Sequence, residues 1–325
     1  MQQRPASKPS HAVTVTLNPA IDQTLQIPRF AAGRVNRVQR VSEHPGGKGV
    51  NVAAALSDFG VGVAVTGFLG RENAGSFEAM FADRGLKDRF IRIPGQTRTG
   101  IKITDSVGRQ TTDINFPGLA PRRSDVVALT RILHGLASPG RWFVLSGSLP
   151  PGLDTRTYAR LVAVLKKGGA RVVLDTSGEP LRAAVQERPD IIKPNREELE
   201  ALVGRKLSGT ADIVRAVRPL LAMGIEVAVV SLGEQGACFV TPERSVIARP
   251  PKVEVASTVG AGDAMVAGLV VAQLKGKSLE DTARMATAFS LEVVTRGQSG
   301  LGSRAAIGRW AQRVTCTNTM HRTKR

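Results

Sequence analysis

A glycine-rich stretch at residues 257–268, Ser-Thr-Val-Gly-Ala-Gly-Asp-Ala-Met-Val-Ala-Gly, constrains the fold of this chain most strongly. The residues before it, 251–255, are strand-like, and residues 264–274 are apolar with Gly268 as their one helix breaker. This pattern predicts a strand, a glycine turn and a helix that begins near Gly260 and Gly262. Such a turn favours a bound anion, because unpaired N–H groups and the positive end of the helix dipole meet there.

An acidic residue, Asp263, lies inside this predicted anion site and would repel a bound phosphate. One interpretation is structural, since a carboxylate stabilises the first turn of a helix. In the other, Asp263 takes a proton from a hydroxyl while the backbone of Gly260, Ala261 and Gly262 holds the charge on a transferred phosphoryl group. The stretch alone leaves both open, and the rest of the chain favours the second.

Composition describes an ordinary globular protein, large enough at 325 residues for one α/β domain with an inserted lobe. No stretch is long and apolar enough to span a bilayer, and residues 1–10 lack the apolar core of a secretory signal. Two cysteines and four scattered histidines argue against a disulfide framework and against zinc chemistry. We therefore expect a cytoplasmic protein.

The net charge is unusual, with 45 Lys and Arg against 27 Asp and Glu, or +18. Such a balance favours anionic substrates and permits nonspecific binding to nucleic acid. However, the basic residues are spread out except at 321–325, and aromatic residues make up 4% of the chain, so no platform for stacking bases is expected. A basic nucleic-acid-binding protein remains the non-enzyme alternative.

Strands and helices alternate from residue 124 onward, which predicts a mostly parallel sheet with helices on both faces. Earlier strands, within 13–42 and 97–118, are not interleaved with helices, and we expect them to form a small separate sheet, a lid over the site. We expect a loose tail at residues 1–11, one domain at 12–313 and a basic tail at 314–325. The predicted helices are 50–59, 74–84, 124–137, 155–167, 181–186, 197–203, 211–223, 261–274 and 279–295. The predicted strands are 11–17, 24–27, 33–41, 62–67, 97–104, 110–116, 142–146, 171–175, 190–193 and 226–231, with a hairpin at 237–248.

Polar and glycine residues follow four successive predicted strands, at 146–152, 175–178, 193–195 and 231–236. In a parallel sheet these carboxyl ends form the edge at which ligands bind. Asn195 and Glu198 have the spacing of a capping box, with Asn as N-cap and Glu three residues later. A role for Glu198 toward magnesium-bound water is an alternative, and the two are compatible.

A second glycine turn, Gly46-Gly47-Lys48-Gly49, precedes another predicted helix and carries Asn51 one turn inside. Its glycine spacing differs from that of a Walker A loop, and it ends in Asn51 where a Walker A loop ends in Lys followed by Ser or Thr. The chain also has no G-x-G-x-x-G fingerprint of a dinucleotide-binding fold. The turn is either an ordinary start of a helix with a solvated Lys48, or a place where a polar ligand meets bare backbone.

These segments together resemble the ribokinase-like (PfkB-type) carbohydrate kinases. Residues 46–51 resemble the first signature of the family, residues 257–268 the second, and residues 193–198 its Asn-x-x-Glu segment. The resemblance runs from about residue 12 to residue 313. Residues 16–22, 67–70 and 111–118 are similar to the branch that acts on phosphosugars. The fold it implies is ribokinase-like, with a mostly parallel central sheet, helices on both faces and a small β-sheet lid.

The resemblance implies an ATP-dependent kinase of a ketohexose phosphate, with fructose 1-phosphate as the favoured acceptor. Tagatose 6-phosphate and fructose 6-phosphate are the alternatives. Asp263 would be the base, and Gly260, Ala261 and Gly262 the anion hole.

The resemblance also implies the groups around the ligands. The candidate ligands of the sugar hydroxyls are Asp22, Gly46, Gly47, Asn51 and Ser148. Lys48, Arg98 and Lys102 would face the phosphate that the substrate already carries. The candidate nucleotide ligands are Lys193, Asn195, Ser231, Gly233, Gly236, Thr258, Gly260 and Gly262. Glu198 would act through Mg²⁺ and its waters. A homodimer through the lid is expected, because a small open sheet has edges and a face to cover.

Overall fold

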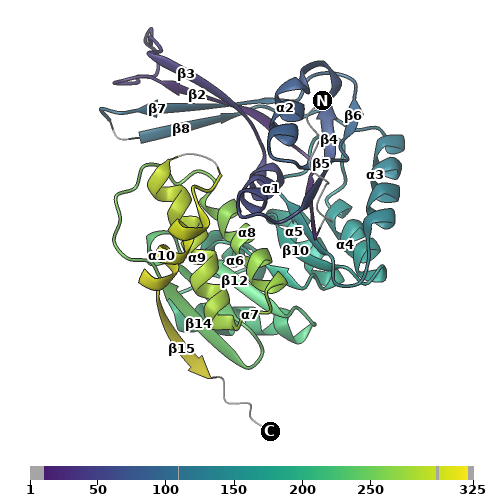
Figure 1. The fold of residues 1–325 in the computed structure, drawn as a ribbon, viewed down its shortest axis with the longest axis vertical. Helices are drawn as coiled ribbons and strands as arrows, with labels where there is room; N and C mark the ends of the chain where they lie inside the picture. The colour runs from purple at the N-terminus through teal and green to yellow at the C-terminus, as the bar shows by residue number, and fades with distance from the viewer. Residues whose placement is uncertain (1–10, 109, 298–299, 321–325) are drawn as a thin grey trace, which may run out of the picture.

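The computed structural model describes residues 11–108, 110–297 and 300–320. They form one large sheet, helices on both of its faces and a separate four-stranded sheet (Figure 1). Residues 1–10 and 321–325, which hold most of the expected N-terminal tail and the basic cluster, lie outside the described residues. The parallel strands of the large sheet are β1 (Ala12–Thr16), β4 (Val63–Gly70), β5 (Lys87–Asp88), β6 (Ile91–Ile93), β9 (Trp142–Ser146), β10 (Arg171–Asp175), β11 (Ile191–Ile192) and β12 (Val227–Ser231).

Both faces of this sheet are buried, as continuous apolar strands predict. On β9, Trp142 and Val144 enter one core while Phe143 and Leu145 enter the other. The helices of the first core are α1 (Lys48–Asp58), α2 (Gly75–Asp83), α8 (Ala261–Leu274), α9 (Leu279–Arg296) and α10 (Arg304–Arg313). The helices of the second core are α3 (Arg123–Leu136), α4 (Thr157–Lys167), α5 (Gly178–Ala184), α6 (Arg196–Val203) and α7 (Thr210–Ala222).

Helix α8 is apolar around its whole circumference because it is buried on all sides, with α1 and α9 as neighbours. A Cβ atom on Gly268 would lie 2.7 Å from the Cα atom of Ala286 on α9. The glycine that looks like a helix breaker in the sequence therefore allows close packing of two helices.

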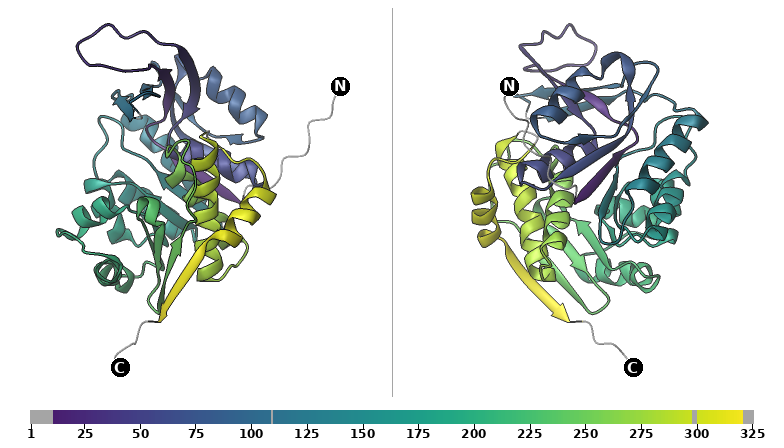
Figure 2. Two further views of the ribbon diagram at one scale, coloured as in Figure 1. Left: turned by 90° about the vertical axis from the view of Figure 1, so that its left-hand side faces the viewer. Right: turned by 45° about the vertical axis from the view of Figure 1, so that its right-hand side comes forward.

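One edge of the large sheet is antiparallel and is built by β13 (Ala237–Val240), β14 (Arg244–Arg249) and β15 (Thr315–Met320). This corrects the expected tail at 314–325 over residues 315–320, where β15 pairs with β14 along its length (Figure 2). The segment Thr-Cys-Thr-Asn-Thr-Met is too polar to signal a strand, and the pairing with β14 determines its structure.

The lid predicted from the early strands is present as the four-stranded sheet β3-β2-β7-β8, which stands apart at one end of the molecule (Figures 1 and 2). Its strands are β2 (Ala20–Gln26), β3 (Arg40–Gly46), β7 (Thr99–Asp105) and β8 (Gln110–Asn115). The carboxylate of Asp105 accepts hydrogen bonds from the backbone N–H groups of Arg29 and Phe30, so the β2–β3 connection is tied to β7.

Two further sequence expectations differ from the structure. Residues 251–255 are irregular instead of a strand, since consecutive prolines at 250 and 251 remove two N–H donors from the ladder. Residues 33–39 form a connection that the Asn36 side chain closes by bonding to Ala31, so the strand expected at 33–41 begins only at Arg40. Helix α10 and strands β5 and β6 have no counterpart among the predicted elements. In the part of the chain that the structure describes, every helix is too short or too polar to cross a membrane.

Candidate active site

The first turn of α8 is the centre of the candidate site. Gly260 is the N-cap with φ of 78°, in the left-handed region that favours glycine, and α8 begins at Ala261. The first N–H groups of a helix have no acceptor within it, so this turn can form the predicted anion site of Gly260, Ala261 and Gly262, although the N–H of Ala261 donates at 3.3 Å to the carbonyl oxygen of Thr258 in this structure. The side chain of Asp263 lies in this turn and is buried.

Asp263 is held by a residue far away in the sequence, since the Asn51 side-chain N–H donates to its Oδ2 at 2.8 Å. Asn51 comes from the first turn of α1, which packs on α8. Close approach explains the glycines around it. A Cβ atom on Gly47 would lie 2.9 Å from the Cα atom of Pro19, and one on Gly49 would lie 2.4 Å from the Thr16 hydroxyl oxygen. The two glycine turns of the sequence therefore meet at one carboxylate.

The electrostatic environment makes Asp263 a stronger base than an ordinary carboxylate. Burial, together with the nearby negative charge of Asp175, raises the pKa of Asp263 to about 6. The hydrogen bond from Asn51 and the charges of Lys48 and Lys193 oppose this rise. A general base is most effective with a pKa near the working pH, and this environment shifts Asp263 in that direction.

Two lysines converge on Asp175, the last residue of β10. The Asp175 side chain is 1% exposed, and its oxygens lie 3.1 Å from Lys193 Nζ and 3.7 Å from Lys48 Nζ. A Cβ atom on Gly262 would lie 3.6 Å from Lys193 Nζ, so this ammonium group is beside the anion site. Burial works against the charge of Lys48, but the carboxylates of Asp175, Asp263 and Glu198 outweigh it and raise the pKa of Lys48.

The lid provides a second cluster around Asp22 on β2. A Cβ atom on Gly46 would lie 2.3 Å from one oxygen of this carboxylate, and one on Gly100 would lie 2.8 Å from the other. Glycine at both positions therefore keeps the space around Asp22 open. Burial raises the pKa of Asp22, while Lys102 and Arg98 act in the opposite direction.

Arg98 and Lys102 form the basic part of this lid cluster. The guanidinium group of Arg98 donates at 3.3 Å and 3.4 Å to the carbonyl oxygens of Phe116 and Asn18. Burial lowers the pKa of Arg98, with Asp22 opposing. Lys102 Nζ lies 3.6 Å from Asp113. The structure thus brings Arg98 and Lys102 together at Asp22, whereas Lys48, expected with them, contacts Asp175 instead.

The candidate nucleotide residues lie at the ends of neighbouring strands. Asn195 and Glu198 form the predicted capping box, in which each side chain accepts from the backbone N–H of the other at 2.7 Å and 2.8 Å. Asn195 also forms a parallel bridge with Ser231 at the end of β12.

Three other candidates have local roles that explain their identity. Gly236 has φ of 92°, and a Cβ atom there would lie 2.0 Å from the carbonyl oxygen of Ala248, so packing against β14 requires glycine. Gly233, with φ of 60°, starts a short 3₁₀ turn. The carbonyl of Thr258 accepts from the N–H of Ala261 and closes the turn before α8. Ser148 lies away from these and accepts a hydrogen bond at 3.2 Å from Asn18 at the base of the lid.

Three residues in these clusters have no predicted role in the sequence. Asp175 was visible as an acidic residue at the end of a buried strand, but the strand order is needed to see that it meets Lys193. Gly100 sits opposite Asp22 in the register of β2 and β7. Asn18 lies within residues 16–22, which resemble the phosphosugar branch, but no site role was predicted for it; its side-chain oxygen would lie 2.0 Å from a Cβ atom on Gly118.

This arrangement can deprotonate a hydroxyl and hold a group with several negative charges at the same place. Asp263 can accept the proton, and the start of α8 with Lys193 can stabilise a transferred anionic group. Arg98 and Lys102 can face a second anionic group on the lid side. These are the elements that phosphoryl transfer to an alcohol needs.

Comparison with known proteins agrees with this chemistry. Residues 15–306 match the model of the pfkB family carbohydrate kinases. The chain is 51% identical over 279 residues to a 1-phosphofructokinase of Rhodobacter capsulatus, covering 86% of this chain and 88% of the relative. It is 48% identical to a 1-phosphofructokinase of Xanthomonas campestris pv. campestris, covering 86% of this chain and 90% of the relative.

Solved structures of a phosphofructokinase share the fold of this chain. Phosphofructokinase-2 of Escherichia coli in complex with fructose-6-phosphate superimposes with a TM-score of 0.86 at 28% identity, covering 93% of this chain and 98% of that one. The tetrameric inhibited form of that enzyme gives a TM-score of 0.85 at 29% identity, with the same coverage of both chains.

Proposed function

Because the chain belongs to the pfkB family of carbohydrate kinases, we propose that it transfers the γ-phosphoryl group of ATP to fructose 1-phosphate. The products are fructose 1,6-bisphosphate and ADP. The observation that carries the proposal is the buried Asp263, held by Asn51 at the start of α8, with a pKa of about 6. The names of the relatives from Rhodobacter capsulatus and Xanthomonas campestris support the choice of acceptor.

In the proposed reaction, the acceptor hydroxyl gives its proton to Asp263 as its oxygen forms the new bond to the γ-phosphorus atom. The bond between that phosphorus and the β–γ bridging oxygen breaks, and ADP leaves with the electron pair. The backbone of Gly260, Ala261 and Gly262 holds the charge on the transferred group, next to the ammonium group of Lys193.

The lid holds the sugar phosphate in this proposal. Asp22, Gly46 and Gly47 on the lid side, with Asn51, contact the sugar hydroxyls, and Ser148 adds a hydroxyl at the base of the lid. Arg98 and Lys102 bind the phosphate that the substrate already carries. Closure of the lid excludes water, so that ATP is not hydrolysed in place of the transfer.

The nucleotide lies along the ends of β11 and β12 in this proposal. Its ligands are Lys193, Asn195, Ser231, Gly233, Gly236, Thr258, Gly260 and Gly262. No group of three His, Cys, Asp or Glu side chains within residues 11–108, 110–297 and 300–320 could enclose a metal ion. Mg²⁺ usually keeps several waters and binds through one or two carboxylates and substrate phosphates, so the single carboxylate of Glu198 is compatible with such a site. Glu198 would hold it through water, and the ion would neutralise charge on the phosphates.

A homodimer through the lid completes the proposal. Strands of the lid expose apolar side chains, with Val41 on β3 58% and Ile114 on β8 44% exposed, and Val35 in the β2–β3 connection is 87% exposed. A four-stranded sheet with such residues in water has an uncovered apolar surface. A Val41→Lys variant should shift the mass in light scattering toward the monomer, and an unchanged mass would remove Val41 from the interface. A cytoplasmic location is also part of the proposal, and the two unpaired cysteines, Cys238 and Cys316, suit a reducing compartment.

The deciding experiment measures ADP release with Mg²⁺-ATP and four acceptors, compared by kcat/KM. The acceptors are fructose 1-phosphate, fructose 6-phosphate, tagatose 6-phosphate and fructose. We expect a clear lead for fructose 1-phosphate. A higher kcat/KM for fructose 6-phosphate, which is bound in the structure of Escherichia coli phosphofructokinase-2, would support the proposed phosphoryl transfer but change the proposed substrate. A higher kcat/KM for tagatose 6-phosphate would have the same meaning. No turnover with any of them would contradict the proposed substrate class.

A further inference from the structure

Asp175 is the buried charged residue in the candidate site to which the family resemblance assigned no role. It ends β10, and its two oxygens face cations from two other elements, Lys48 at the start of α1 and Lys193 after β11. The Ser146 hydroxyl donates to Asp175 Oδ2 at 3.4 Å, and the backbone carbonyl of Asp175 accepts from the N–H of Gly147. These contacts hold the carboxylate at the ligand-binding edge of the sheet.

A lysine carries its charge on a flexible four-carbon stem, so a cation at a fixed position needs a partner that holds it. Lys193 is 5% exposed, and its Nζ atom lies 3.1 Å from Asp175 and beside Gly262 in the anion site. Lys48 is less buried and lies 3.7 Å from the same carboxylate. Both lysines lower the pKa of Asp263, and Asp175 raises it. The charges of Lys48, Lys193 and Asp175 therefore all lie close to the Asp263 carboxyl group.

We propose that Asp175 is a positioning residue, which holds the ammonium groups of Lys193 and Lys48 beside Asp263 before substrates bind. This inference rests on the proposed function, because it gives the two cations their purpose at the transferred phosphoryl group. The negative charge of Asp175 has a second effect, since it disfavours the ionised form of Asp263 and keeps that carboxylate basic.

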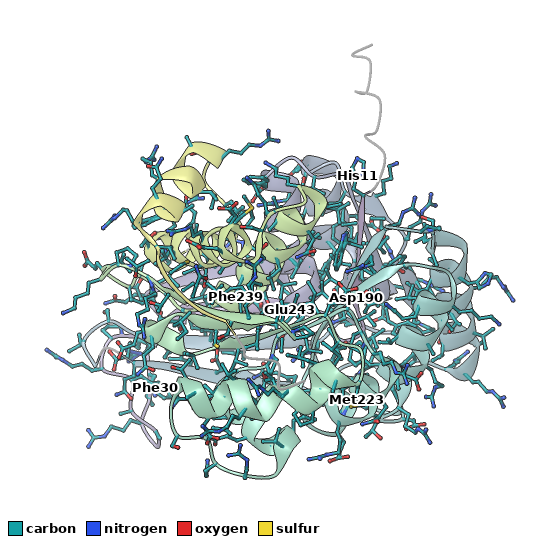
Figure 3. The ribbon with its side chains drawn as sticks, turned by 90° about the horizontal axis from the view of Figure 1, so that it is seen from below. His11, Phe30, Asp190, Met223, Phe239 and Glu243 are labelled. Carbon is teal, nitrogen blue, oxygen red and sulfur yellow. The ribbon has the colours of Figure 1, made fainter. Side chains whose placement is uncertain are left out.

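The alternative is that Asp175 only satisfies buried charges, and the chain contains a matched control for that role. Asp190 directly precedes β11, so it lies at the opposite end of the parallel strands, as does His11 before β1 (Figure 3). It is 2% exposed and pairs with Lys166 at 2.8 Å and Arg171 at 2.9 Å. Its other oxygen accepts from the N–H of Val172 at 2.7 Å.

The test compares Asp175→Asn with Asp190→Asn in the full-length protein, by ADP release from pH 5 to pH 9 and by thermal unfolding. For Asp175→Asn we expect kcat to fall about 10²-fold, the cost of a small misplacement of reacting groups, with KM for the phosphosugar within about twofold of wild type. The acidic limb of the kcat/KM profile should move to lower pH. Asp190→Asn should lower Tm and leave kcat and the limb unchanged. Asp175→Glu, which keeps the charge, should return the limb toward its wild-type position.

A second measurement needs no turnover and separates this inference from the proposed function. Lys48 is 43% exposed at its side chain, and Asp175 raises its pKa, so its rate of acylation by an acetylating reagent reports the contact. By peptide mass spectrometry at pH 8, we expect severalfold faster labelling of Lys48 in Asp175→Asn and no change in Asp190→Asn. Unchanged labelling and an unchanged pH limb would overturn the inference. Inactive wild-type protein with faster Lys48 labelling in Asp175→Asn would instead overturn the proposed function and leave the positioning contact standing.

Discussion

Asp190 and Asp175 lie at opposite ends of the parallel strands, and each is a buried carboxylate between two cations. At Asp190 every contact is short and direct, and a backbone N–H adds to the two cations. At Asp175 the second cation, Lys48, is 3.7 Å away. The negative charge of Asp175 also acts on a second carboxylate, Asp263, and helps to raise its pKa. Removing one partner of a fully paired buried charge destabilises a fold, whereas a carboxylate close to another carboxylate is harder to ionise and becomes a stronger base.

The largest effect should come from Asp263→Asn, which removes the base and keeps the shape. We expect kcat to fall roughly 10²- to 10⁴-fold, the usual contribution of general base catalysis, while sugar and nucleotide still bind. ADP release and isothermal calorimetry measure the two properties. Asp190→Asn should keep its kcat. A variant Asp263→Asn that retains most of its rate would show that another group is the base.

The next comparison is between Arg98 in the lid cluster and Arg92 outside it. Arg98 makes two long hydrogen bonds to carbonyls, while Arg92 on β6 is paired with Glu78 and Asp88. For Arg98→Ala we expect KM for the phosphosugar to rise about 10- to 100-fold, as loss of a charge-assisted hydrogen bond predicts, with little change for an unphosphorylated sugar. Arg92→Ala should leave KM unchanged. Equal KM values for wild type and Arg98→Ala would remove Arg98 from the phosphate site.

Acidic pH should reduce activity, because Asp263 becomes protonated. The pKa of Asp263 is about 6, and the protonated form cannot accept a proton from the acceptor. We therefore expect kcat/KM to fall about tenfold per pH unit below that value. An acidic limb that persists in Asp263→Asn would assign the titration to a different group.

The smallest expected effect is on thermal stability. Because the pKa of Asp263 is raised on folding, the folded state binds its proton more tightly than the unfolded state, and ionisation of Asp263 destabilises the fold as pH rises through about 6. Asp263→Asn should therefore raise Tm at pH 7, with a smaller gain at pH 4.5. Asp190→Asn should cost about 2 kcal/mol, because it replaces hydrogen bonds to a charged group. Thermal unfolding at both pH values tests the pair, and a lower Tm for Asp263→Asn at pH 7 would contradict the comparison.

The sequence predicts most strongly where local and global signals agree. The bounds of α8, Ala261–Leu274, match the prediction because a glycine N-cap precedes an apolar run that is buried on all sides. The alternation of strands and helices likewise predicts the parallel sheet, and the early uninterrupted strands predict the lid.

The missed elements depend on tertiary pairing that local patterns do not contain. The ends of β3 were misplaced because Pro45 and Gly46 are typical of a turn, but β3 is an edge strand of the lid, where proline is tolerated. β15 is polar and gains its structure from β14. Among the site residues, Asp175 could not be assigned because only the strand order places the end of β10 beside Lys193.

The hydrogen bond between Asn51 and Asp263 joins residues that are 212 positions apart, and α8 and α1 pack together at that contact. On a ribosome, the first of these residues emerges long before the second. A nascent chain can complete its N-terminal strands while its base is still unsynthesised. Closing so long a loop costs conformational entropy that the contact must offset, so we expect this contact to form late in refolding. Turnover should therefore be the last property that a refolding chain regains, after its secondary structure.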